Sequence, residues 1–167
     1  MIGDRRGAAL VEFALIVPFL LILYLVGYDA AQATAAYRKL STTTVELANV
    51  TAQYTTMSAT DVSNVFNASA QVMAPFSTSN LRIVLTEIKT DANGNPSVYW
   101  SQAYNGASAL TSVSVPAGIV SPNTNYVLVQ TTYSWTPPLN FGSFGTVPMA
   151  DQIYMLPRQS ASIPYTG

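Results

Sequence analysis

The carboxylate of Glu12 is the most unusual chemical group in this sequence, because it is the one charge between Ala8 and Gly27. A helix over that run would be about 30 Å long, which matches the hydrocarbon core of a bilayer. A carboxylate at the bilayer centre costs about 2.5–3.5 kcal/mol, so a charge here requires a compensating partner. The run therefore predicts a membrane-spanning helix that carries one functional charge.

Few other groups in the chain could do chemistry. There is no Cys and no His, which excludes disulfides, thiolate–zinc sites and catalysis by imidazole or thiol. No nucleophile elbow, phosphate-binding loop or dinucleotide fingerprint occurs. The acids are scattered without a paired motif: Asp4, Glu12, Asp29, Glu46, Asp61, Glu87, Asp91 and Asp151. We therefore predict no catalytic residue, no cofactor and no metal. The alternative, an enzyme acting on envelope polymers, would need acids that cluster in the folded domain.

One stretch resembles the beginning of a calcium loop, namely Asp91-x-Asn93-x-Asn95. Its sixth position is Pro96 rather than Gly, and its twelfth is Gln102 rather than Glu, so the EF-hand pattern fails. The Asn-Gly pair and the proline are typical of a hairpin turn. We predict a turn without a metal.

Length and composition limit the chain to one domain and an anchor. Of its 167 residues, 9% are charged and 49% are hydrophobic, whereas soluble domains usually carry about a quarter of charged residues. Ser, Thr, Asn and Gln must therefore supply most of the polar surface, which suits an extracytoplasmic or assembled protein. The net charge of −1 gives no basic surface, so we predict no nucleic-acid partner.

Several interpretations of the N-terminal region compete. Arg5 and Arg6 favour a cytoplasmic N-terminus. A secretory signal would be cleaved after Ala31-Gln32-Ala33, but its apolar run is normally about 7–15 residues long. A plain signal anchor would leave Glu12 as an incidental charge. A third interpretation starts from the motif around Glu12.

In this motif, Gly7 is followed by a short apolar segment and then by Glu12 and Phe13. This order resembles a class III prepilin cleavage site. The longer run Arg6-Gly7-Ala8-Ala9-Leu10-Val11-Glu12-Phe13-Ala14-Leu15, with Pro18, is similar to the TadE-like family. These are minor pilins, or pseudopilins, of the tight-adherence (Flp-type) pilus, a branch of type IV pili. The resemblance covers about residues 5–28, and Phe13 and the long C-terminal region distinguish the chain from Flp major pilins.

The resemblance implies that a prepilin peptidase cuts between Gly7 and Ala8. Residues 1–7 would be a cytoplasmic leader, residues 8–27 a transmembrane and assembly helix, and residues 28–167 an extracytoplasmic α+β pilin-like domain. The implied partners are other pilin subunits, the inner membrane and a surface or host ligand. The chain would lie in the inner membrane with its N-terminus inside before assembly, and in a cell-surface pilus afterwards.

Cleavage would also give Glu12 a partner. The new ammonium group on Ala8 would lie four residues before it, about 6 Å along a helix. Near that charge the carboxylate can stay ionised by pairing within its own chain or with a neighbour. We therefore expect Glu12, with Phe13, to set the register of assembly. The alternative is an anchored or secreted adhesin-like binding domain with no filament role, which predicts an uncut Met1 or a mature start at Thr34.

The apolar pattern predicts two helices. We expect one helix from Ala8 to about Thr56, with a kink or local unwinding at Pro18. A second helix should lie near Asp61–Ala74, with Thr60 as its N-cap and Pro75 ending it. The stripe expected to face the core on the first helix consists of Leu40, Leu47, Val50, Tyr54 and Met57.

After Pro75 the hydrophobic period changes to two, which predicts an antiparallel sheet of about four strands. The expected strands are 81–90, 97–104, 126–136 and about 152–156, with a short additional strand at 110–115. We expect most of the strand aromatics to pack in the core rather than to bind a ligand: Tyr99, Trp100, Tyr104, Tyr126, Tyr133, Trp135 and Tyr154. The predicted class is α+β.

Overall fold

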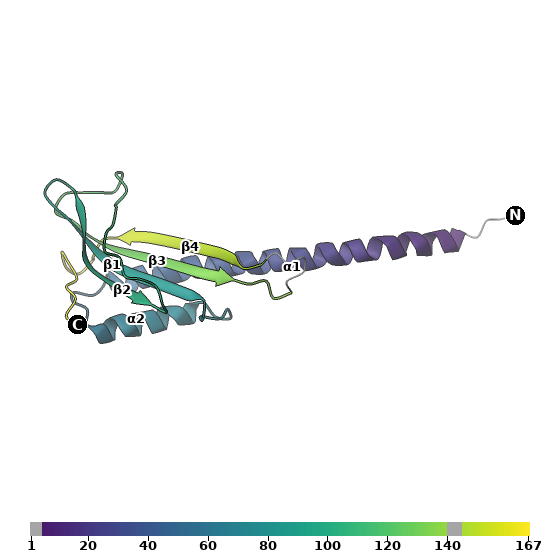
Figure 1. The fold of residues 1–167 in the computed structure, drawn as a ribbon, viewed down its shortest axis with the longest axis horizontal. Helices are drawn as coiled ribbons and strands as arrows, with labels where there is room; N and C mark the ends of the chain where they lie inside the picture. The colour runs from purple at the N-terminus through teal and green to yellow at the C-terminus, as the bar shows by residue number, and fades with distance from the viewer. Residues whose placement is uncertain (1–4, 140–144) are drawn as a thin grey trace.

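The chain forms one long helix with a small domain built around its second half. The computed structural model describes residues 5–139 and 145–167. Helix α1 extends far beyond the domain at its N-terminal end (Figure 1). Within the described ranges the elements are α1 (Arg5–Thr51), α2 (Ala59–Val72), β1 (Leu81–Thr90), β2 (Pro96–Tyr104), β3 (Asn125–Trp135) and β4 (Val147–Met155). The predicted α+β class, with two helices and a four-stranded antiparallel sheet, is confirmed.

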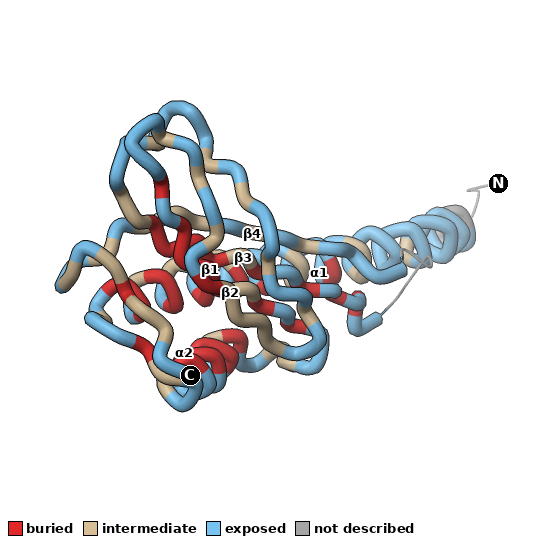
Figure 2. The backbone as a smooth tube through the Cα atoms, turned by 60° about the vertical axis from the view of Figure 1, so that its left-hand side comes forward, coloured by how far each residue is buried: buried red, intermediate tan, exposed pale blue. Residues whose placement is uncertain are grey.

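Helix α1 is continuous, since Ala, Leu and other good helix formers dominate its sequence. It neither ends nor unwinds at Pro18, so the predicted local unwinding is absent, and a kink there stays a prediction. The N-terminal half is exposed, and full burial starts at Asp29 (Figure 2). From there, buried positions follow the helical period through Ala36, Leu40 and Leu47.

Helix α1 ends at Thr51, before the predicted end near Thr56. The backbone N–H of Gln53 donates to Val50 O at 3.1 Å, and that of Tyr54 donates to Thr51 O at 3.0 Å. These i→i−3 bonds tighten the last turn and close the helix. Val50 is 41% exposed, so its predicted inward position was wrong, because it lies at the edge of the stripe whose buried members here are Leu47, Ala48 and Thr51.

The N-cap of α2 is Ser58, and the prediction of Thr60 was wrong. The Ser58 N–H donates to Asp61 Oδ2 at 2.9 Å, and the Asp61 N–H donates to Ser58 Oγ at 3.2 Å. This reciprocal capping box needs an acidic side chain three residues after the cap, which only Ser58 has. The hydroxyl and the N–H of Ser58 lower the pKa of Asp61 below its ordinary value of 3.8. The helix ends at Val72, before Pro75.

The four strands form one antiparallel sheet in the order β2-β1-β3-β4. Strand β4 starts at Val147, earlier than the predicted start near residue 152, and residues 110–115 are in no strand. Pro148 made the beginning of β4 resemble a loop in the sequence. It is tolerated because β4 is an edge strand, where a missing N–H need not break a ladder.

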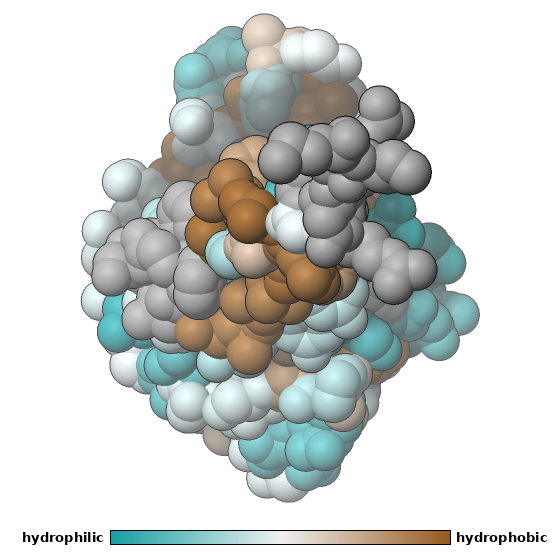
Figure 3. Space-filling model, turned by 90° about the vertical axis from the view of Figure 1, so that its right-hand side faces the viewer, coloured by the Kyte–Doolittle hydropathy of each residue, from teal (hydrophilic) through white to brown (hydrophobic). Residues whose placement is uncertain are grey.

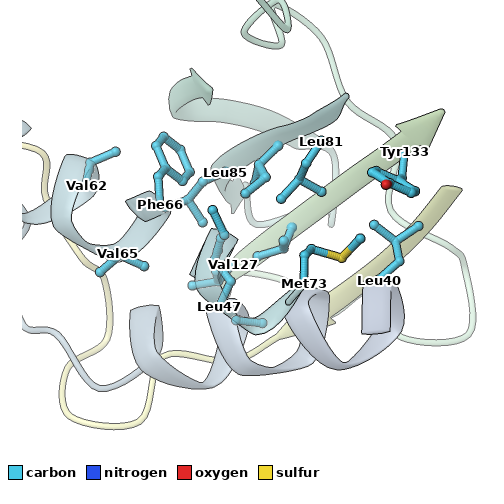
Figure 4. Packing of buried hydrophobic residues seen from close by; sticks show 14 of the residues in the cluster. Leu40, Leu47, Val62, Val65, Phe66, Met73, Leu81, Leu85, Val127 and Tyr133 are labelled. Carbon is cyan, nitrogen blue, oxygen red and sulfur yellow. The ribbon is translucent and has the colours of Figure 1, made fainter. Parts of the chain in front are cut away.

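The core lies between one face of the sheet and the two helices. Leu47 of α1, Phe66 of α2, Leu85 of β1 and Val127 of β3 point into the same space (Figure 4). The opposite face of the sheet is partly covered by the chain between β2 and β3, where Leu110, Val113 and Val115 pack on Ile88, Tyr126 and Leu128. The domain therefore has apolar packing on both sides of its central strands.

Most strand aromatics pack in the apolar clusters on the two faces of the sheet, in agreement with the prediction. Trp100, Tyr126, Tyr133 and Trp135 are buried, whereas Tyr99 is 48% exposed. Phe66 of α2 packs on Tyr104 of β2 with ring centroids 5.6 Å apart, and Trp100 packs on Tyr165 at 5.7 Å. These tilted pairs are within the distances that favour aromatic contact.

A buried pair of hydroxyl groups joins α1 to the middle of the sheet. The Oγ1 atoms of Thr44 and Thr131 are 2.6 Å apart, and the Thr44 hydroxyl also donates to Leu40 O at 2.9 Å. With the Thr44 proton used on that carbonyl, the Thr131 hydroxyl donates to Thr44 in preference to Asp151 O, which lies further away at 3.5 Å. Both side chains are fully buried, so each depends on these bonds to replace water.

We expect Thr44→Val to lower the free energy of unfolding by about 1–3 kcal/mol, because the buried Thr131 hydroxyl loses its close partner. Thr131→Val should cost less, since Thr44 keeps its bond to Leu40 O. The double variant should be more stable than Thr44→Val alone, because no hydroxyl is left unpaired. Urea unfolding of the full chain in detergent measures all three, and simply additive costs would show that the pair is not coupled.

Candidate functional site

The first half of α1 is an apolar surface that nothing in the described chain covers. Its exposed fractions are 70% at Leu10, 67% at Phe13, 73% at Leu15 and 68% at Phe19. Apolar side chains gather on the end of the molecule that faces the viewer in Figure 3. Soluble proteins rarely expose contiguous apolar surface of this extent, so such a surface marks a membrane or protein contact. By length and composition, this helix could cross a membrane.

Glu12 lies on that surface among apolar side chains. The residue is exposed, and no hydrogen bond from another described side chain reaches its carboxylate. Phe13, next in the chain, is also exposed. The residues predicted for processing and register, Gly7, Ala8, Glu12 and Phe13, therefore share the first two turns or so of one helix. The structure places them at the free end of α1, away from the domain (Figure 1).

Gly7 has space around it. A Cβ atom built on this residue would meet no other heavy atom within 4 Å, and the same is true of Gly27. Both glycines lie in a helix, where Gly is less favourable than Ala by about 0.8–1.0 kcal/mol. Packing in the described chain therefore gives no reason for Gly at position 7.

The exposed half of α1 meets the domain near Tyr28. The Gln32 amide donates to the Tyr28 hydroxyl at 3.0 Å. One residue further on, Asp29 is only 6% exposed, and its Oδ1 accepts a long 3.5 Å bond from the N–H of Leu139. The second half of α1 thus begins with a buried carboxylate rather than with an apolar residue.

The other buried acid, Glu87, is a polar site that the sequence interpretation missed. It is fully buried, and its Oε2 accepts from the Trp100 indole N–H at 2.7 Å. Its Oε1 accepts from the Ile163 N–H at 2.9 Å and from the Asn125 amide at 3.0 Å. The alternation of Leu81, Ile83 and Leu85 toward the core places Glu87 next in that series, which is the signal that could have identified it.

The bonds of Glu87 indicate a structural role. Its donors come from β2, from the start of β3 and from the segment that follows β4. Three donors satisfy a carboxylate without a cation. Glu87 therefore joins the C-terminal segment to the sheet.

The predicted turn at Asp91 also uses its carboxylate internally. Oδ1 accepts from the N–H groups of Asn93 and Asn95, both at 2.8 Å, and Oδ2 accepts from the Asn95 amide at 2.9 Å. The side-chain bond from Asn95, helped by its N–H, lowers the pKa of Asp91 below 3.8. In the described ranges, no three His, Cys, Asp or Glu side chains gather at a geometry that could hold a metal.

Comparison of the chain with protein-family models, with curated proteins and with solved structures found no match.

We expect Glu87→Gln to destabilise the domain by about 1–3 kcal/mol, because the new amide would place a donor against other donors. The C-terminal segment should loosen first, since Ile163 loses its carboxylate partner. Limited proteolysis and the fluorescence of Trp100, recorded with Trp135 replaced by Phe, measure this loosening. Gln152→Glu on β4 is the control, and equal protease sensitivity of the two variants would contradict the structural role.

Proposed function

We propose that this chain is a minor pilin-like subunit that is anchored in a membrane by the first half of α1 and then assembles into a filament through that half. The observation that carries the proposal is the unpartnered apolar surface of residues 9–27, which continues without interruption into the spine of the domain. The domain holds the second half of α1 by burial. The first half remains free to replace its contacts with lipid by contacts with other helices.

The residues of the leader motif support a processing step in this proposal. Gly7 precedes the apolar run, and its exposed position with no neighbouring atom leaves it accessible on the described helix. We propose that a prepilin peptidase cuts between Gly7 and Ala8, which makes Glu12 the fifth residue of the mature chain. The competing cut after Ala33 would fall inside continuous helix α1, where Ala36 and Leu40 are buried against the domain.

The charge of Glu12 supports an assembly role. A bilayer accounts for the exposed apolar side chains, but it disfavours an unpaired carboxylate. A neighbouring subunit that supplies a positive group would remove this penalty and fix the axial register. Phe13 lies beside Glu12 and would contribute apolar contact to the same neighbour.

The mature N-terminus tests the processing step. In cells that contain a prepilin peptidase, intact-protein mass should show a chain that begins at Ala8. Gly7→Val should abolish cleavage, because it removes the glycine of the proposed cleavage motif, while the folded domain should be unaffected since a Cβ at position 7 meets no other atom. Gly27→Val is the matched control, the same substitution at a helical glycine with equal space, and it should leave cleavage unchanged. A mature chain that begins at Met1 or Thr34 would contradict the proposal.

Substitution of Glu12 tests the assembly step. Glu12→Ala should leave membrane insertion intact or improve it, because it removes a charge from the apolar span. It should nevertheless reduce recovery of the subunit in purified filaments by about tenfold or more, equivalent to about 1.4 kcal/mol. Leu15→Ala is the control for loss of side-chain bulk, and normal recovery of the Glu12 variant would rule out the assembly role.

A further inference from the structure

A groove runs along the outward side of α1 where the helix joins the domain. Its helical side is formed by Gln32, Ala35, Arg38, Lys39 and Thr42, and its wall by Pro75 and Phe76. The volume is about 380 Å³. Gln32, Pro75 and Phe76 also line a second depression of about 390 Å³, which extends toward Tyr28 and Trp135. The groove is thus parallel to α1 and partly apolar.

The charges of the groove are basic. Arg38 and Lys39 are exposed, and they are the cations that α1 carries beyond Arg6. The next acid along this part of the helix, Glu46, lies about two turns further on, roughly 10 Å away. Ala35, which lines the groove, is small, and this lets another helix approach closely. A helix with apolar side chains and a single carboxylate is the partner that this surface complements.

We propose that the groove binds the N-terminal helix of a second copy of this chain, with the Glu12 carboxylate of that copy at Arg38 and Lys39. The inference rests on the proposed function and names the cations that would pair with the Glu12 carboxylate. Glu12 is the one acid in the exposed apolar half of α1, so only one position of the incoming helix satisfies the charge. The apolar residues around Glu12 then contact Ala35 and Phe76.

The proposed contact sets a defined axial displacement. Glu12 and Arg38 are separated by 26 positions, about 39 Å along a helix. Two copies anchored at the same depth of one bilayer cannot make this contact, so it forms only when one copy has been displaced along the axis. At that displacement, Tyr24 of the incoming helix lies level with Val50, the exposed residue near the end of α1.

Cross-linking tests this displacement, because the chain has no Cys of its own. Ala9 and Ala35 are both exposed and share the 26-residue offset. A chain with Ala9→Cys and Ala35→Cys should give a ladder of cross-linked multimers with a short bis-maleimide in pilus-forming cells. The two cysteines of one chain are about 39 Å apart on a helix and cannot be joined internally. The matched control is Ala9→Cys with Ala68→Cys, which places the second cysteine on the exposed face of α2.

Charge reversal tests the named cations. In the Ala9→Cys, Ala35→Cys chain, Glu12→Lys should lower the cross-linked fraction by about tenfold, and adding Arg38→Glu with Lys39→Glu should restore it. Equal cross-linking in the α2 control, or normal incorporation into filaments without the ladder, would overturn this inference and leave the proposed function standing. Failure of the unmodified chain to enter any filament would overturn both.

Discussion

The structure depends on the continuity of α1, because one helix must fit two environments that require different surfaces. One environment is the folded domain, and the other is lipid or neighbouring helices. Its second half needs a stripe of small and apolar residues against a sheet, and Ala36, Leu40 and Leu47 provide it. Its first half is apolar all round, as expected for a helix surrounded by lipid or by other helices. Since no turn separates the halves, movement of the first half along its axis must carry the domain with it.

The domain must therefore hold the helix firmly, and polar bonds at separate points supplement the apolar core. The Thr44–Thr131 hydroxyl pair fixes α1 against β3 in the middle of the sheet. At the far end, the Met57 N–H donates to Pro164 O at 3.0 Å, and the Arg158 N–H donates to Ala52 O at 2.8 Å. Glu87 binds the same C-terminal segment from the sheet side. These bonds attach the chain's last segment to the end of α1, where a pull along the helix would act.

The sequence predicted the fold better than it predicted the polar contacts. The hydrophobic pattern identified α1, β1 and β3 to within a few residues of their ends, because a long apolar helix and two long strands of period two are strong signals. The errors lie where a local bond outweighs the pattern. Ser58 caps α2 because Asp61 stands three residues later, and β4 starts at Val147 because an edge strand tolerates Pro148. The role of Glu87 depends on donors from residues far apart in the sequence, which no local pattern contains.

For the candidate site, the sequence supplied the residues, and the structure supplied the surface that could receive them. Gly7, Glu12 and Phe13 were identifiable as a motif, whereas the groove beside Phe76 arises only when the segment after α2 packs next to α1. A bilayer can accommodate the apolar side chains of residues 9–27, but it offers nothing to Glu12. The groove on a second copy of α1 would provide apolar contacts for these side chains and cations for Glu12, at one axial position. In the proposed assembly this groove would pair with the Glu12 carboxylate in addition to the ammonium group that cleavage would leave on Ala8.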